Sequence, residues 1–222
     1  MGDYYPKSKV EIKGFTARYY DSLMNIITFG RYSSFIKKAI RFMKIKPSEK
    51  ILDLGAGTGR NACLMMNYLS KDGELIGVDI SEEMIFQFEK KCASFQNVKG
   101  IHTRVDRPLP FEEEFDKVFI SFVLHGFPQH ARETITDNAY KALKNNGEFH
   151  ILDWNEINPK TFPFYQRIFF KLIECPYAFD FIKRDWKRKL ANSNFGNFEE
   201  FFFFKGSVRL LKAEKLNDSK KR

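Results

Sequence analysis

The sequence has 222 residues, 43% of them hydrophobic, and a formal net charge of +9. This length and apolar content favour one globular domain with a filled core. Its three cysteines, Cys63, Cys92 and Cys175, are odd in number and lack the spacing of a metal site, so we expect no disulfide framework and no bound metal. No run reaches the roughly eighteen apolar residues of a membrane span, and the N-terminus lacks a signal-peptide core. These features predict a cytoplasmic protein.

Short apolar runs alternate with stretches long enough to form helices. Residues 15–43 carry apolar side chains at helical spacing, and Lys46-Pro47-Ser48 predicts a turn after them. Strand-like runs follow at 50–54, 74–79, 98–105, 115–123 and 147–153. This alternation predicts a Rossmann-like, doubly wound α/β fold, with a mainly parallel sheet and helices on both faces.

The last two strand-like runs are too close together for a parallel connection. They span Phe198 to Phe204 and Ser207 to Ala213, and only Lys205-Gly206 separates them. We therefore expect an antiparallel hairpin at the end of the sheet.

The predicted organisation is one domain with several parts. These are an N-terminal helical lid (1–46), a cofactor-binding core (47–154), a helical insertion (155–197), the terminal hairpin (198–214) and a tail (215–222).

The segment ILDLGAGTGR, residues 51–60, places three glycines between the first predicted strand and a helix. Ligands of open α/β sheets bind beyond the carboxyl ends of the strands, where this loop lies. Gly55, Gly57 and Gly59 allow positive φ angles and close approach of a ligand to the backbone. Asp79, 24 positions after Gly55, ends the next strand, where a carboxylate can accept both hydroxyls of a ribose.

The spacing G-x-G-x-G differs from the dinucleotide pattern G-x-G-x-x-G, and Asp53 stands two residues before the first glycine. A pyrophosphate would be repelled by this carboxylate, whereas a cationic amino-acid ligand would be attracted. S-adenosylmethionine carries an ammonium and a sulfonium group and fits this pattern. The alternatives are a turn or helix-cap role for Asp53 and a cap of the following helix for Asp79.

LDLGAGTGR resembles the first motif of the class I S-adenosylmethionine-dependent methyltransferases, and GVDISEEMI (77–85) resembles the segment that follows it. LPFEEEFDKVFISFVLHGF (109–127) and AYKALKNNGEFHILDW (139–154) resemble later parts of the same family. The resemblance implies S-adenosyl-L-methionine as the cofactor. The residues it implies for cofactor binding are Asp53, Gly55, Ala56, Gly57, Gly59, Asp79, Ile80 and Asp106, with Asp53 near the amino group, Asp79 on the ribose and Asp106 near the adenine amine.

The segment from Tyr19 to Ile40 resembles the entry region of the ubiquinone and menaquinone C-methyltransferase group. The shared positions are Tyr20, Asp21, Thr28, Phe29 and Gly30. The chain departs from that group after the fourth strand, where it has Leu124-His125-Gly126 in place of an Arg-Asn pair. The resemblance implies a quinone-like or lipid-like acceptor.

Methyl transfer needs donor and acceptor held in line, with water excluded. His125 is our candidate base because it follows the fourth strand at the binding edge of the sheet. Tyr20 and Asp21 are candidates for a lid over both ligands. The alternatives are a histidine that packs or caps, and ordinary residues on a helix surface.

The last third of the chain is basic and aromatic. Residues 156–222 contain fifteen Lys and Arg against eight Asp and Glu, so they carry +7 of the +9. Within them, the insertion Pro163 to Leu190 has apolar residues on nearly every side of its first expected helix, and the basic run Lys183 to Lys189 around Trp186 follows that helix. This pattern fits either core packing or an apolar acceptor pocket whose basic rim contacts an anionic membrane.

We favour a methyltransferase of a small apolar or aromatic acceptor, acting as a monomer or homodimer. The alternatives are a methyltransferase of RNA or of a water-soluble metabolite, and a cofactor-binding partner subunit without activity. Nucleic acid is the less favoured partner, because the chain has neither an Asn-Pro-Pro-Tyr-like motif nor a recognisable RNA-binding module.

Overall fold

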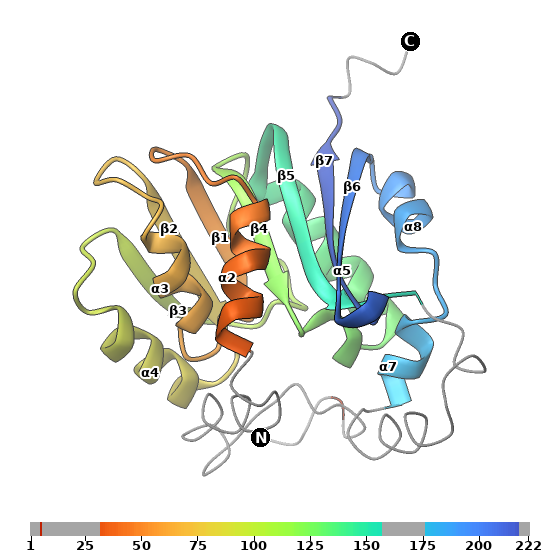
Figure 1. Ribbon diagram of the computed structural model, residues 1–222, viewed down its shortest axis with the longest axis horizontal. Helices are drawn as coiled ribbons and strands as arrows, with labels where there is room; N and C mark the ends of the chain where they lie inside the picture. Colours follow the sequence, from red (N-terminus) through yellow and green to blue (C-terminus); the bar gives the residue numbers. More distant parts are fainter. Residues whose placement is uncertain (1–4, 6–31, 157–175, 218–222) are drawn as a thin grey trace.

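A computed structural model of the chain describes residues 5, 32–156 and 176–217. At its centre is a seven-stranded sheet (Figure 1), in the order β3-β2-β1-β4-β5-β7-β6. The strands are β1 (Lys50–Leu54), β2 (Glu74–Asp79), β3 (Val98–His102), β4 (Phe115–Ser121), β5 (Leu143–Trp154), β6 (Phe195–Phe203) and β7 (Val208–Lys215).

The first five strands run parallel to one another, and β7 is the reversed strand of the sheet. β1 pairs with β2 and β4, β2 with β3, and β4 with β5, all in parallel. β7 is antiparallel to both β5 and β6. The mainly parallel sheet and the antiparallel terminal hairpin are thus confirmed.

Some strand limits differ from those expected. The third strand ends at His102 instead of residue 105, and β5 begins four residues earlier than expected, at Leu143. The fourth ends at Ser121, because Phe122 adopts a left-handed backbone (φ 53°) that turns the chain out of the sheet.

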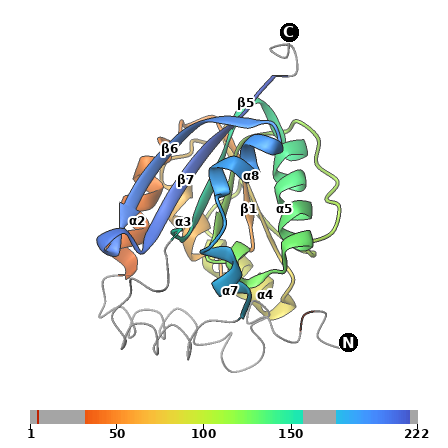
Figure 2. The ribbon, with the colours of Figure 1, turned by 90° about the vertical axis from the view of Figure 1, so that its right-hand side faces the viewer.

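Helices cover both faces of the sheet (Figure 2). The described helices on one face are α2 (Tyr32–Phe42), α3 (Arg60–Met66) and α4 (Glu82–Cys92), and those on the other are α5 (Gln129–Ala142), α7 (Pro176–Phe181) and α8 (Trp186–Asn192). The doubly wound arrangement is therefore confirmed. Residues 15–31 of the predicted N-terminal helical region lie outside the described residues.

Local sequence explains where two of these helices begin. Ser81 accepts a hydrogen bond from the backbone N of Met84 at the start of α4, whose first turn is acidic and whose last turn is basic. Asp185 caps α8 in the same way, by accepting from the backbone N of Arg188.

Two apolar cores lie on the two faces of the sheet. Buried side chains of α2, α3 and α4 pack on one face, and those of α5, α7 and α8 pack on the other. Trp186 is buried in the second core, so it is not an exposed part of the basic run. The strand order reverses between β1 and β4, which places the switch point of the sheet between the loops that follow these two strands.

Candidate functional site

The glycine loop leaves β1 at the switch point and is tied to the neighbouring strand. The backbone N–H groups of Gly55 and Ala56 both donate to the carbonyl of Val78, at 2.8 and 3.0 Å. Gly55, Gly57 and Gly59 have φ angles of 73°, 55° and 77°, which side chains rarely allow. The positive φ angles predicted for these three glycines are therefore confirmed.

Two of the three glycines are also required by packing. A Cβ atom on Gly55 would lie 2.6 Å from Val123 Cγ2, and one on Gly59 would lie 2.8 Å from the ring of Phe88. A Cβ atom on Gly57 would meet nothing within 4 Å. The open side of the loop is therefore at Gly57, where a ligand could approach the backbone.

Asp79 joins the end of β2 to this loop. Its Oδ2 accepts from the backbone N of Gly57 at 2.9 Å, and its Oδ1 accepts from the backbone N of Ser81 at 2.9 Å. The side-chain cap of α4 comes from Ser81, so Asp79 is not the capping residue. Burial raises the pKa of Asp79, despite these two hydrogen bonds. Ile80 follows it, and the Ile80 carbonyl lies 2.8 Å from Nε2 of His102.

Asp53 is buried near the end of β1, with only 1% of its surface exposed. Its Oδ2 is buried without a hydrogen-bond partner among the described residues. Burial, together with the nearby Asp79 carboxylate, raises the pKa of Asp53 to about 8. A buried acid of this kind favours a cationic partner.

Asp106 lies after β3 and already has two partners. Arg104 donates to both of its carboxylate oxygens, from Nε at 3.0 Å and from a terminal nitrogen at 2.8 Å, and the Tyr5 hydroxyl donates to Oδ2 at 2.9 Å. These contacts lower the pKa of Asp106 even though burial acts in the opposite direction. A ligand amine would have to share this carboxylate.

His125 lies in a short 3₁₀ turn, η1 (Leu124–Gly126), directly after β4. Its Nδ1 is 2.7 Å from Oδ1 of Asp153, and its backbone N donates to Oδ2 of the same carboxylate at 3.1 Å. Asp153 was not identified as a site residue from the sequence. Its position could have indicated it, because it is an acidic residue at the carboxyl end of the strand next to β4. Tyr20 and Asp21 lie outside the described residues.

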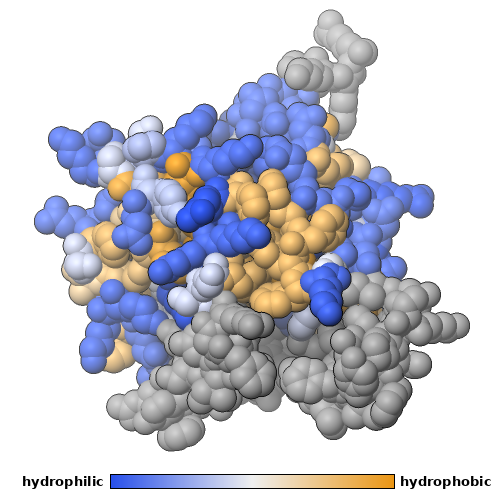
Figure 3. Space-filling model, viewed as in Figure 1, coloured by the Kyte–Doolittle hydropathy of each residue, from blue (hydrophilic) through white to orange (hydrophobic). Residues whose placement is uncertain are grey.

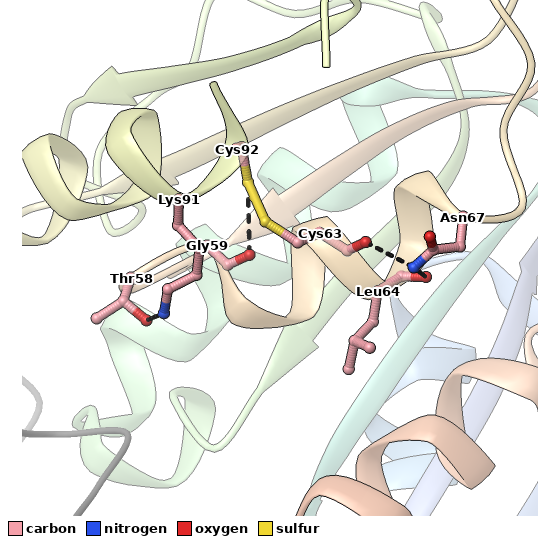
Figure 4. The surroundings of a disulfide bond; sticks show 7 residues. All are labelled: Thr58, Gly59, Cys63, Leu64, Asn67, Lys91 and Cys92. Atoms are coloured by element: carbon pink, nitrogen blue, oxygen red, sulfur yellow. Dashed lines mark hydrogen bonds between the residues drawn. A yellow bond between two sulfur atoms is a disulfide. The ribbon is translucent and has the colours of Figure 1, made fainter. Parts of the chain in front are cut away.

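The expectation of no disulfide is wrong. Cys63 of α3 and Cys92 of α4 form one, across 29 residues of sequence, with Cα atoms 5.8 Å apart (Figure 4). The two cysteines are far apart in sequence, which suggested that they do not pair. They meet because α3 and α4 pack against each other after the glycine loop. The sulfur of Cys92 lies 3.6 Å from the carbonyl of Gly59, and Lys91 donates to the Thr58 hydroxyl at 2.9 Å. The disulfide therefore sits against the last residues of the loop.

Two further observations concern metal sites and membrane spans. The described residues contain no group of three or more His, Cys, Asp or Glu side chains that could hold a metal ion. None of the described helices is both long enough and apolar enough to cross a bilayer.

A family model described as "Methyltransferase domain" matches residues 51–147, from β1 into β5. This stretch includes the glycine loop, Asp79, Asp106 and His125. The chain contains a class I S-adenosylmethionine-dependent methyltransferase domain. The cofactor of this methyltransferase domain is S-adenosylmethionine, as the sequence predicted.

The chain is similar to a demethylmenaquinone methyltransferase of Staphylococcus saprophyticus, with 30% identity over 155 residues. The match covers 69% of this chain and 65% of that relative, slightly less than two thirds of its length. The CurJ carbon methyltransferase shares the fold, with a TM-score of 0.70, 16% identity and coverage of 91% of this chain and 60% of that one. A methyltransferase of Aquifex aeolicus also shares the fold, with a TM-score of 0.60 and 16% identity, and the match covers 83% of this chain and 98% of that one.

The site residues of this methyltransferase domain fit the ligand. The unpartnered Oδ2 of Asp53 is a ready acceptor for an ammonium group, and the open side of Gly57 gives room beside the loop. Asp79 can accept hydroxyl groups with the lone pairs that its two backbone contacts leave.

Proposed function

We propose that this chain methylates a small apolar or aromatic acceptor of the hydroxylated naphthoquinone class, with S-adenosylmethionine as the donor. When bound, the donor supplies an electrophilic methyl group on a sulfonium. In this proposal Asp53 holds the donor's ammonium group and Asp79 holds its ribose. Asp106 lies near the adenine amine, and the backbone of Ala56, Gly57 and Ile80 completes the binding surface.

The observation that carries the acceptor class is a cluster of five aromatic side chains at the carboxyl edge of the sheet. We call it the aromatic wall; it consists of Phe35, Phe122, Trp154, Phe203 and Phe204. The ring of Phe35 lies 6.2 Å from that of Phe122, 4.9 Å from Phe203 and 4.8 Å from Phe204, between ring centroids. Phe122 in turn lies 6.2 Å from Trp154.

The aromatic wall borders the proposed site through its chain neighbours. Phe122 directly follows β4 and Trp154 ends β5, so the two residues are close in sequence to His125 and Asp153. Phe204 is 48% exposed although it is a large apolar side chain. Apolar side chains also gather on the face between α2 and β6 (Figure 3). Phe35 and Phe203 are buried, so Phe204 is the exposed end of the wall, and an exposed aromatic ring at the edge of the sheet that carries the cofactor loop favours a flat, apolar acceptor.

The name of the staphylococcal relative gives the acceptor class a second support. That protein is named a demethylmenaquinone methyltransferase. We further propose that the chain works in the cytoplasm and meets its acceptor at an anionic membrane surface.

A direct assay tests the acceptor class. The purified protein is incubated with S-adenosylmethionine and a short-chain prenylated demethyl naphthoquinol, and mass spectrometry follows the gain of one CH₂. Phe204→Ala should raise the KM for the naphthoquinol about tenfold or more, because burial of a phenylalanine contributes about 1.5 to 3 kcal/mol. The affinity for S-adenosylmethionine should stay unchanged.

Phe202→Ala is the matched control. Phe202 is 55% exposed and alternates with Phe201 and Phe203, so it lies on the other face of β6. Its loss should leave the KM for the naphthoquinol unchanged. Equal effects of the two variants, or no methylation of the naphthoquinol, would contradict the proposed acceptor class.

A further inference from the structure

A carboxylate holds His125 through both its ring and its backbone. Oδ1 of Asp153 lies 2.7 Å from the ring Nδ1, while Oδ2 accepts from the backbone N of His125 at 3.1 Å. Oδ1 also accepts from the backbone N of Trp154 at 2.7 Å. Asp153 is 2% exposed, so these hydrogen bonds are formed away from water.

A buried arginine fixes the same turn through its carbonyl groups. Arg132 of α5 is fully buried and donates to the carbonyl of Leu124 at 3.2 Å and to that of His125 at 3.0 Å. It also donates to the carbonyl of Tyr177 and to Asp180, which ties η1 to α7. The backbone that carries the imidazole is therefore held by groups from β5, α5 and α7.

The turn lies beside the glycine loop. β4 pairs with β1, and Val123 of the same connection packs against Gly55 so closely that a Cβ atom there would lie 2.6 Å from it. The turn that carries His125 thus lies next to the proposed donor loop, at the carboxyl edge of the sheet.

We infer that Asp153 is a positioning residue that keeps the His125 proton on Nδ1 and so makes Nε2 the proton acceptor during methyl transfer. This inference rests on the proposed function. As the acceptor's hydroxyl or acidic C–H bond gives its proton to Nε2, its electron pair forms the new bond to the methyl carbon. The carbon–sulfur bond breaks at the same time, and its electron pair returns to sulfur, leaving a neutral thioether and an imidazolium that Asp153 stabilises.

A purely structural role for Asp153 is the competing explanation, because its carboxylate also holds two backbone N–H groups. Asp153→Asn separates the two roles. An asparagine offers one acceptor oxygen, so an oxygen kept on the His125 backbone N turns the amide NH₂ toward Nδ1 and removes the hydrogen bond to the Trp154 backbone N. The imidazole would then carry its proton on Nε2 and could not accept another there.

Nitrogen NMR of the neutral imidazole reports the tautomer without any acceptor present. We expect Nδ1–H for His125 in the wild-type protein and a shift to Nε2–H in Asp153→Asn. Asp185→Asn, a matched change at the cap of α8, should keep the wild-type tautomer. Calorimetry with S-adenosylmethionine should give the same affinity for all of these proteins within about threefold.

Kinetics with the naphthoquinol form the second arm. Asp153→Asn and His125→Gln should each lower kcat about 100-fold or more at neutral pH, and the double variant should be no slower than the slower single variant. A wild-type tautomer in Asp153→Asn, or a His125→Gln variant that keeps wild-type kcat, would overturn the inference. If the wild-type protein does not methylate the naphthoquinol, the acceptor class fails, and the tautomer alone decides the role of Asp153.

Discussion

Asp53 is a carboxyl group whose charge should depend on the ligand. It is buried, its Oδ2 has no hydrogen-bond partner among the described residues, and its pKa is raised to about 8 because burial and Asp79 both disfavour the anion. Without a ligand the group is therefore largely protonated at neutral pH. An ammonium group placed beside it would favour the anion and lower its pKa.

Binding of S-adenosylmethionine should therefore release a proton from Asp53. Because the complex holds fewer protons than the free protein, affinity should rise with pH between about 6 and 7.5, below the range in which an α-amino group titrates. Calorimetry in buffers of different ionisation enthalpy measures the released proton directly. Asp53→Asn should bind more weakly and lose both the proton release and the pH dependence; a variant that keeps them would show that another group is titrating.

Single residues were predictable from the sequence where a fixed spacing carries the chemistry. The three glycines have the expected positive φ angles, and Asp79 meets the loop at Gly57 as its spacing indicated. Partners contributed by distant parts of the chain were not predictable. The contact of Asp153 with His125 depends on the pairing of β4 with β5, and Tyr5 lies 101 positions before Asp106, to which it donates.

At the scale of whole elements, the apolar runs predicted the positions of the strands well, because each buried strand is bounded by turn residues. The residues at which the strands begin and end were less predictable. Phe122 leaves β4 in a left-handed conformation within a run that reads as continuous strand. The disulfide between α3 and α4 was missed for a related reason: parallel crossovers bring helices together that are distant in sequence.

The disulfide should stabilise the protein by restricting the unfolded chain. A cross-link that closes a loop of 29 residues contributes about 3.6 kcal/mol by loop-closure entropy. Cys63→Ser should lower the free energy of unfolding of the oxidised protein by up to about that amount, measured by urea denaturation. The control is Cys63→Ser itself, whose midpoint reductant should leave unchanged. Reductant should lower the wild-type midpoint to that of Cys63→Ser; an equal midpoint for oxidised and reduced wild type would show that the cross-link does not stabilise the fold.

Across the whole molecule, some of the positive side chains are held in ion pairs, and only the others can attract an anionic surface. The basic run was expected to present five cations, but Arg184 is bound to Asp180 and Lys187 to Glu200. Lys183 and Arg188 are exposed, and Lys189 is half-buried. Such pairing could not be read from the run itself, because Glu200 comes from β6 and reaches α8 only in the folded chain. The surface that could attract an anionic membrane is thus narrower than composition suggests.

Binding to vesicles tests whether these three cations act together. The protein should associate more with anionic than with neutral phospholipid vesicles at low salt, and the association should weaken as salt rises. Each basic side chain near such a surface contributes about 1 kcal/mol, so changing Lys183, Arg188 and Lys189 to Gln should weaken binding about 100-fold. A matched triple variant changes the exposed Lys71, Lys90 and Lys99, which lie before β2, in α4 and in β3, toward the opposite edge of the sheet, and removes the same charge. Equal loss of binding in both variants would mean that vesicles respond to net charge alone, and that this run does not direct the site toward a membrane.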